Sequence, residues 1–493
     1  MVSGELWRLI DDDALERIAA GAERLLAEAG ARVEHEGILG KLAARGCTVD
    51  ASTQHCRFTP QLIAEATGHY ARQEARNRPE DPLHFRQAVG WDPARPVRLA
   101  HGGSNPHLLD WPSGERRLAT SADVAAMAKM AHVLDEFAVV GQVLTASDVD
   151  SRVEPVWNVV RRMELTDKPV RGGEVMHPEN VKHLVRLGEI ETGRPGCVDL
   201  VPACNFIISP LRYNRRALAC MVEKMRFGVR NDVGSMPVSG MSAPVTVAGT
   251  AALMLAEVVG GWCISYVIDP DVAVGAGFAS GSMDMRSANA VFGSPEAVLQ
   301  DLAVSQCCRR LYGIHSTWCA FNYVDCKTPG IQAAIEKLMP LSALPLAGAL
   351  PFYPDGLLSA GQDYSPVQHL MEFEVANALD RFMGTFEVTD ETLALDLLAE
   401  RAGRVNASFL ETDHTLAHYA GEQYYPRWLD RSRWQGTETE RRAERDMLER
   451  VDRYWKDAAA AYEQPEIEPA KLRAARQVLE AARQEAPSVE TLG

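Results

Sequence analysis

Aromatic and amide side chains gather where the apolar strands of this 493-residue chain are expected to end. These residues are Asn205, Phe278, Trp318, Asn322, Tyr323, Phe352 and Tyr353. A quaternary ammonium has no N–H to donate, but a ring face attracts it by up to about 2 kcal/mol in a dry site. Several rings around one opening would therefore suit an organic cation. Core packing is the alternative for each ring taken singly.

A further candidate is a loop that follows an expected strand at residues 97–101. Residues 102–107 read Gly-Gly-Ser-Asn-Pro-His, and small residues at a strand end let a ligand approach the backbone closely. His107 is therefore a candidate binding residue, with an ordinary loop histidine as the alternative.

Cysteines and histidines offer a competing interpretation as a metal site. Five such residues lie close together in the sequence: Cys307, Cys308, His315, Cys319 and Cys326. Two of them, Cys307 and Cys308, fall inside an expected helix and point in different directions, which does not favour a shared ion. His414 and His418 share a helix face by their spacing, but the His-Glu-x-x-His pattern is missing. We therefore expect packing roles and no metal ligands.

Strands and helices alternate over most of the chain. Expected strands lie at residues 137–142, 169–173, 201–209, 233–238, 272–278, 316–321 and 346–353, and expected helices at 155–165, 178–191, 214–228, 247–268, 294–312, 330–344 and 365–383. Parallel strands need such crossovers, and a series this long favours a closed (β/α)8 TIM barrel, in which the loops after the strands carry the site. An open doubly wound sheet is the alternative, although residues 275–280 lack the third glycine of a nucleotide fingerprint.

The apolar segment at residues 245–268 is long enough to span a bilayer. Glu257 lies in its middle, glycines interrupt it and no Lys/Arg cluster flanks it. We therefore expect a buried barrel helix with a turn near Gly260, and no membrane span.

Composition limits the function classes. The 51 Lys+Arg and 67 Asp+Glu give a net charge of −16 without a basic stripe, which argues against nucleic acid. An acidic surface could favour a cationic substrate, although most such charge is simply solvated. Ten scattered cysteines without a Cys-x-x-Cys and without a signal peptide indicate reduced thiols in the cytoplasm.

Three parts are expected: a mostly helical N-terminal cap at residues 1–95, the TIM barrel at 96–390 and a helical C-terminal extension at 391–493. In the extension, one helix at residues 438–462 would place Leu448, Val451 and Trp455 on a single stripe. Such a stripe on a charged tail suggests docking on the barrel or on a second subunit, and we expect a homo-oligomer.

A series of short motifs adds a family resemblance. In order, they are Met236-Pro237, Ala243-Pro244-Val245-Thr246-x-Ala248-Gly249, Ala256-Glu257-Val258, Met283-Asp284-Met285-Arg286, Gly293-Ser294-Pro295-Glu296, Tyr312-Gly313, Asp325-x-Lys327, Thr389-Asp390-Glu391-Thr392-Leu393-Ala394 and His414-Thr415-Leu416-x-His418. In these motifs the chain resembles the trimethylamine:corrinoid methyltransferase family, in particular members that lack pyrrolysine and act on quaternary amines such as glycine betaine.

The resemblance implies transfer of a methyl group from a quaternary or tertiary methylamine to the Co(I) corrinoid of a partner protein. A quaternary nitrogen leaves as a neutral tertiary amine, so no acid is needed to activate it, and the enzyme would contribute desolvation and in-line placement. Because the sequence lacks an Asp-x-His-x-x-Gly corrinoid motif, we expect this chain to bind no cofactor tightly.

The resemblance also assigns site residues. Tyr323 falls near the position that pyrrolysine takes in relatives, and it is the catalytic candidate together with Asn322. The candidates for substrate binding are His107, Asn205, Phe278, Trp318, Phe352 and Tyr353, of which His107 and Asn205, with Asn322, could donate to a betaine carboxylate. Residues 319–323 depart from the Gly-rich segment of the family, which leaves the substrate open.

Two other functions remain. One is a metal-dependent barrel lyase or hydrolase, which would purify with bound ion. The other is a non-catalytic barrel that binds a betaine.

Overall fold

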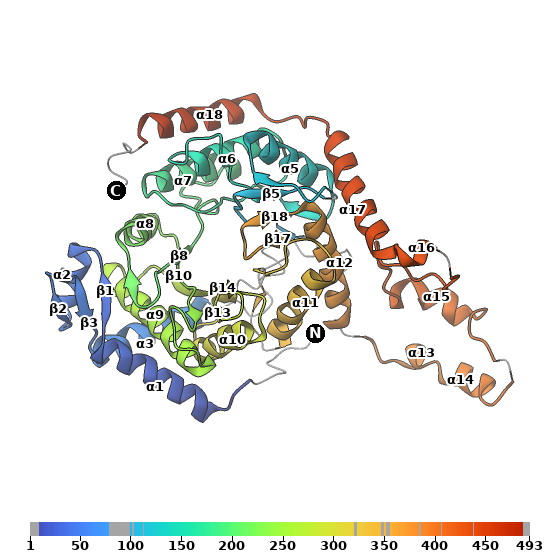
Figure 1. Cartoon of the computed structure of the whole chain (residues 1–493), viewed down its shortest axis with the longest axis horizontal. Helices are drawn as coiled ribbons and strands as arrows, with labels where there is room; N and C mark the ends of the chain where they lie inside the picture. The colour runs from blue at the N-terminus through green and yellow to red at the C-terminus, as the bar shows by residue number, and fades with distance from the viewer. Residues whose placement is uncertain are drawn as a thin grey trace.

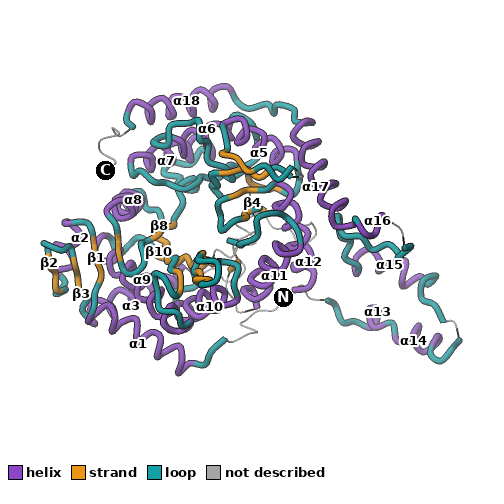
Figure 2. Tube along the Cα trace, in the orientation of Figure 1, coloured by secondary structure: helices purple, strands orange, loops and turns teal. Residues whose placement is uncertain are grey.

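The computed structural model describes residues 9–77, 99–100, 103–111, 113–319, 323–346, 350–351, 355–383, 386–405, 407–436 and 438–486. It is a mixed α/β structure in which short strands lie inside a ring of helices (Figures 1 and 2). Three of the expected site residues, Asn322, Phe352 and Tyr353, lie outside the described residues.

The N-terminal part is mostly helical. Its elements are α1 (Asp12–Glu28), β1 (Ala31–Val33), α2 (Glu36–Ala44), β2 (Thr48–Asp50), β3 (His55–Arg57) and α3 (Pro60–Asn77). Gly30 ends α1 with φ +77°, and a β-carbon there would lie 2.3 Å from the carbonyl oxygen of Cys56. The small sheet β2-β3-β1 continues into β9 (Arg212–Tyr213), so this part is joined directly to the central structure.

A five-stranded parallel sheet forms the centre. Its order is β16 (Leu350–Pro351), β15 (Thr317–Cys319), β12 (Val274–Phe278), β10 (Asn231–Ser235) and β8 (Cys204–Phe206). A second parallel pair, β4 (Leu99–Ala100) and β7 (Phe137–Val139), continues through a parallel bridge between Val140 and Val170. Within the described residues no ladder joins these two groups, so the closed eight-stranded barrel is not confirmed.

Helices cover the outer side of these strands. They are α5 (Ser121–Val133), α6 (Glu154–Met163), α7 (Glu179–Thr192), α8 (Arg215–Arg226), α9 (Val247–Ile268), α10 (Pro295–Arg310), α11 (Ile331–Leu346) and α12 (Pro366–Met383). Each matches an expected crossover helix except α5, which the sequence analysis did not predict. The largest apolar core lies between α1, α9, α10 and the five-stranded sheet.

Short strands occupy the loops. These are β5 (His107–Leu109), β6 (Arg116–Leu118), β11 (Val238–Ser239), β13 (Gly281–Asp284), β14 (Asn289–Val291), β17 (Leu357–Leu358) and β18 (Asp363–Tyr364). They form two further sheets, β11-β13-β14 and β17-β18-β5-β6.

The long apolar helix α9 is a core helix. By length and composition it could cross a membrane, but 83% of its most apolar window is buried inside the protein. The expected turn near Gly260 is wrong, because α9 runs unbroken through Gly260 and Gly261. These glycines serve packing instead: a β-carbon at Gly260 would lie 2.5 Å from the Tyr213 hydroxyl, and one at Gly261 would lie 2.7 Å from Val233.

The C-terminal part is helical: its last two helices lie along the outside of the body, whereas its first two project away from it (Figure 1). It contains α13 (Asp390–Leu393), α14 (Leu395–Arg401), α15 (Asp413–Glu422), α16 (Glu438–Arg441), α17 (Ala443–Ala460) and α18 (Pro469–Gln484). The single helix expected at 438–462 is wrong, since it breaks at Arg442 into α16 and α17. The α17 helix packs on α5 and α12, and α18 packs on α6 and α7.

The loop after β12 depends on a buried acid, which gives a test of the fold. Asp301 of α10 accepts a hydrogen bond from the backbone N–H of Ser280 at 3.1 Å, and burial raises the pKa of Asp301 to about 7. Because the pKa is raised in the folded state, the protonated carboxyl group of Asp301 favours folding. This contribution to stability is complete below the unfolded pKa of about 4 and is lost as the pH rises through about 7.

We therefore expect Asp301→Asn, which keeps the acceptor oxygen, to raise the melting temperature at pH 8 more than at pH 5. Thermal unfolding of both proteins across this range measures the difference. An equal effect of the substitution at both pH values would contradict the assignment.

Candidate active site

The two faces of the five-stranded sheet differ in what they contact. On β10 and β12, Val233 packs against α9 and Phe278 belongs to the core shared with α9 and α10, so these residues face the helices. Successive residues of a strand alternate between faces. Asp232 and the glycines at 234, 275 and 277 therefore lie on the opposite, inner face.

Two aromatic rings lie on this inner face. A β-carbon at Gly234 would meet the ring of Phe206 at 2.6 Å, and one at Gly277 would meet the ring of Trp318 at 2.3 Å. The two rings contact each other edge to face, with centroids 6.2 Å apart and planes at 84°. Both side chains are only partly buried. The missing β-carbons thus let a ring pair lie directly on the backbone of neighbouring strands.

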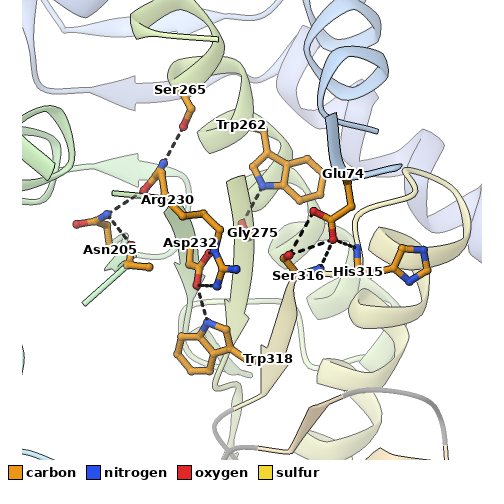
Figure 3. A network of polar contacts seen from close by, with 12 residues as sticks. Glu74, Asn205, Arg230, Asp232, Trp262, Ser265, Gly275, His315, Ser316 and Trp318 are labelled. Carbon is orange, nitrogen blue, oxygen red and sulfur yellow. Dashed lines mark hydrogen bonds and ion pairs between the residues drawn. The ribbon is translucent and has the colours of Figure 1, made fainter. Parts of the chain in front are cut away.

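A buried carboxylate holds one of these rings. The Trp318 indole N–H donates to Asp232 Oδ2 at 3.2 Å (Figure 3). Arg230 donates to both oxygens of Asp232, at 2.6 and 2.8 Å. Asp232 is 2% exposed, and its negative charge raises the pKa of Arg230, so the two remain an ion pair.

The strand that carries Trp318 is fixed from the N-terminal part. Glu74 of α3 accepts hydrogen bonds from the backbone N–H groups of His315 and Ser316, at 3.2 and 3.0 Å, and from the Ser316 hydroxyl (Figure 3). Because Ser316 immediately precedes β15, this carboxylate sets where Trp318 lies.

Tyr323 lies just beyond the end of β15, between two loops. Its ring contacts Phe292, with centroids 5.8 Å apart, and a β-carbon at Gly361 would lie 2.0 Å from it. Burial raises the pKa of Tyr323, and the negative charges of Glu174 and Asp355 raise it further. The phenol is therefore neutral at ordinary pH and keeps its proton.

The acidic groups near Tyr323 differ in their partners. Asp355 is buried with Glu372 and Lys337, whose ammonium lies 2.8 Å from Glu372 and 3.7 Å from Asp355. Glu174 is exposed, follows the expected strand at 169–173 and has no ion pair within the described part of the chain. Glu174 thus leaves a negative charge near Tyr323, whereas Glu372 is paired with the ammonium of Lys337.

The structure does not bring all expected residues together. Trp318 lies on the inner face and Tyr323 just beyond the end of its strand, but Asn205 faces α8, where its side chain accepts from Lys224 and donates to Asn231 at 3.0 and 2.8 Å. Phe278 is 0% exposed among the helices. His107 lies in β5, where Arg116 and the carbonyl of Gln362 contact its ring. The placement thus separates Asn205 and Phe278 from the Trp318 ring.

The sequence analysis missed two residues on the inner face, Phe206 and Asp232, and the exposed Glu174, whose charge acts on Tyr323. Phe206 is the neighbour of the expected Asn205, and strand alternation would have found it once the inner face was known. Glu174 is the first charge after an expected strand, which is a usable signal for a site in an α/β fold.

The cysteines and histidines weighed as metal ligands are dispersed. Among the described residues no three His, Cys, Asp or Glu side chains come close enough to hold an ion. Cys319 faces the helices with Cys307 and Cys308 in the apolar core, and burial raises the pKa of each thiol. His414 and His418 pack against each other with ring centroids 4.5 Å apart.

Comparison with known proteins identifies the class. The family model described as trimethylamine methyltransferase (MTTB) matches residues 4–487. The chain belongs to this family and is a methyltransferase, which confirms the resemblance seen in its motifs.

Individual relatives are distant but match along most of the chain. It is 27% identical over 427 residues to trimethylamine methyltransferase MttB of Desulfitobacterium hafniense (strain DSM 10664 / DCB-2), covering 85% of this chain and 83% of the relative. It is 26% identical over 478 residues to glycine betaine methyltransferase of D. hafniense (strain Y51), covering 95% and 96%. The solved monomethylamine methyltransferase MtmB of Methanosarcina barkeri aligns with a TM-score of 0.43 at 14% identity, covering 91% of this chain and 94% of that one.

The glycine under Trp318 gives a direct test of the inner face. Gly277→Ala would force the indole to move, and we expect a loss of about 1–3 kcal/mol in the free energy of unfolding. Gly40→Ala in α2 is the matched control, because a β-carbon there has no atom within 4 Å. Urea unfolding measures both. A Gly277→Ala protein as stable as the control would show that the ring does not lie where we place it.

Proposed function

We propose that this methyltransferase takes a methyl group from a quaternary or tertiary methylamine, such as glycine betaine, and delivers it to the corrinoid of a separate carrier protein. The observation that carries the proposal is the pair of rings, Phe206 and Trp318, lying over glycines on the inner face of the sheet. The names of the two Desulfitobacterium relatives support the substrate class.

A quaternary amine of the proposed class is an organic cation that cannot donate N–H bonds, whereas a protonated tertiary amine has a single N–H. Ring faces attract such a cation by about 0.5–2 kcal/mol each, depending on how dry the site is. Glu174 adds longer-range attraction, and an excess of acidic over basic residues acts in the same direction. A neutral amine leaving after transfer keeps much less of this attraction, which favours its release.

The residues of this chain place the substrate and need not exchange a proton with it. A quaternary nitrogen becomes a neutral amine when its methyl group leaves, so no general acid is required. A tertiary amine leaves as a neutral amine only when it is bound in its protonated form, which brings its own proton from solution. Tyr323 keeps its proton because of its raised pKa and can donate to an anionic part of the substrate. We retain Tyr323 and Asn322 as catalytic candidates, and Trp318, His107, Phe352 and Tyr353 as binding candidates joined by Phe206. Asn205 and Phe278 are left out because they face the helices.

The methyl acceptor is proposed to arrive on another protein, where the corrinoid supplies a strong nucleophile for carbon. Nothing in the chain is assigned to bind it tightly, because the sequence lacks the Asp-x-His-x-x-Gly motif. We further propose that the two parallel strand groups are parts of one (β/α)8 barrel at residues 96–390, between a cap at 1–95 and an extension at 391–493, in a cytoplasmic enzyme.

Incubation of the purified protein with free cob(I)alamin and single amines tests this function. The panel is glycine betaine, proline betaine, carnitine, choline and trimethylamine, and we expect one of them to give the spectrum of methylcobalamin. Bound metal in stoichiometric amount would favour a lyase or hydrolase instead. Tight binding of an amine without any methyl transfer, even with a carrier protein supplied, would favour a non-catalytic binding protein.

A substitution of the indole tests the cation site itself. We expect Trp318→Leu to weaken binding of the active quaternary amine about tenfold, corresponding to roughly 1.4 kcal/mol of lost ring attraction. The control ligand is a neutral isostere with carbon in place of nitrogen. It should bind the unaltered protein more weakly than the cation does, and the substitution should change its affinity little. Calorimetric titration measures both ligands. Equal losses for cation and isostere would mean that Trp318 contributes shape and not charge recognition.

A further inference from the structure

One segment of the chain stands apart from the rest. Residues 386–423, here called the arm, run between α12 and α17 and contain α13, α14 and α15. Figure 1 shows α13 and α14 at the lower right, clear of the body. None of the residues in these three helices is buried. The arm therefore has no core of its own.

The arm nevertheless carries many large apolar side chains. Among the described residues of the arm, ten large apolar side chains are exposed, including Phe386, Leu395, Val405, Leu410 and Leu416. Leu410 and Leu416 are 81% and 83% exposed. So many exposed large apolar side chains within one segment point to a contact with another molecule.

The C-terminal end of the arm is tied to the body. Arg381 of α12 donates to the carbonyl and carboxylate of Glu422, at 3.0 and 3.1 Å. Just beyond, Glu374 accepts from the Tyr424 hydroxyl and from the backbone N–H of Arg427, the latter at 2.9 Å. The arm is thus a loop with a fixed base that projects outward.

The short helices of the arm indicate that another molecule covers it permanently. They have 4, 7 and 10 residues, whereas helices shorter than about 12 residues are marginal alone in water. A carrier protein that departs after each turnover would return the arm to water every time. A second copy of the chain is present at all times, and it is the occupant that fits a surface needing constant burial.

The same chain offers a surface to receive the arm. Ile331, Ile335 and Leu338 of α11 follow the i, i+4, i+7 pattern and form an exposed apolar stripe, with Ile331 and Ile335 66% and 65% exposed. We propose that the arm of one copy packs on this α11 stripe of a second copy, and that the exchange is reciprocal about a twofold axis.

Sedimentation of the full chain over a dilution series tests the proposal. We expect an assembly whose dissociation constant rises about tenfold or more in the arm variant Leu395→Glu/Leu416→Glu and in the α11 variant Ile335→Glu. Phe227→Glu is the matched control, since Phe227 is an exposed apolar residue at the end of α8, away from both surfaces, and it should leave the assembly unchanged.

Hydrogen exchange of the unaltered protein gives a second readout that needs no variant. Amides of the arm should exchange slowly in the assembly and faster as dilution produces monomer. A full chain that is monomeric at every concentration would overturn the proposal. So would an assembly that both sets of variants leave intact, or arm amides protected equally in the monomer.

Discussion

The absence of side chains at Gly234 and Gly277 is the constraint on which the inner face depends. A β-carbon at either position would overlap a ring, that of Phe206 at 2.6 Å or that of Trp318 at 2.3 Å. Both rings would then have to move away from the strands. Glycine in a strand usually weakens it, because it packs nothing and costs more entropy to order. Here that weakness is offset by the packing on the other face of the same strands.

That packing comes from α9. Gly261 lets the helix approach Val233 closely, and the Trp262 indole donates to the carbonyl of Gly275 at 2.9 Å. Glu257 accepts from the hydroxyl of Ser209 and the backbone N–H of Leu211, both at 3.0 Å, and burial raises the pKa of its carboxyl group. The helix therefore fixes the strands from outside, so the inner face can be occupied by rings and glycines without losing its register.

The sequence was enough to predict most of the helices, because amphipathic or apolar runs bounded by Asp, Ser, Pro or Gly have a strong local signal. It was not enough to decide which side of each strand faces inward. When both faces of a parallel sheet are buried, both carry apolar residues, and the alternation that marks a half-exposed strand is missing. This is why Asn205 and Phe278 were chosen while Phe206, next to Asn205, was passed over. Trp318 was found because its strand ends at an obvious aromatic cluster.

The break at Arg442 and the unbroken course of α9 show a second limit. Glycines at 260 and 261 suggest a turn by local preference, but tertiary contact with Tyr213 and Val233 uses their small size within a continuous helix. Whether a glycine bends a helix or admits a neighbour is decided by residues distant in sequence.

The distribution of charge around the inner face bears on how strongly a cation should be held. A cationic substrate that becomes neutral on losing a methyl group loses charge on the way to the transition state, so a strong anionic site would stabilise the substrate more than the transition state and slow the reaction. Two buried carboxylates are paired with cations, Asp232 with Arg230 and Glu372 with Lys337. Glu174 remains at the exposed side, where water reduces its effect to longer-range attraction. Aromatic rings then make the close contact with the cation. Their attraction is modest, so losing it as the charge disappears adds little to the barrier of the reaction.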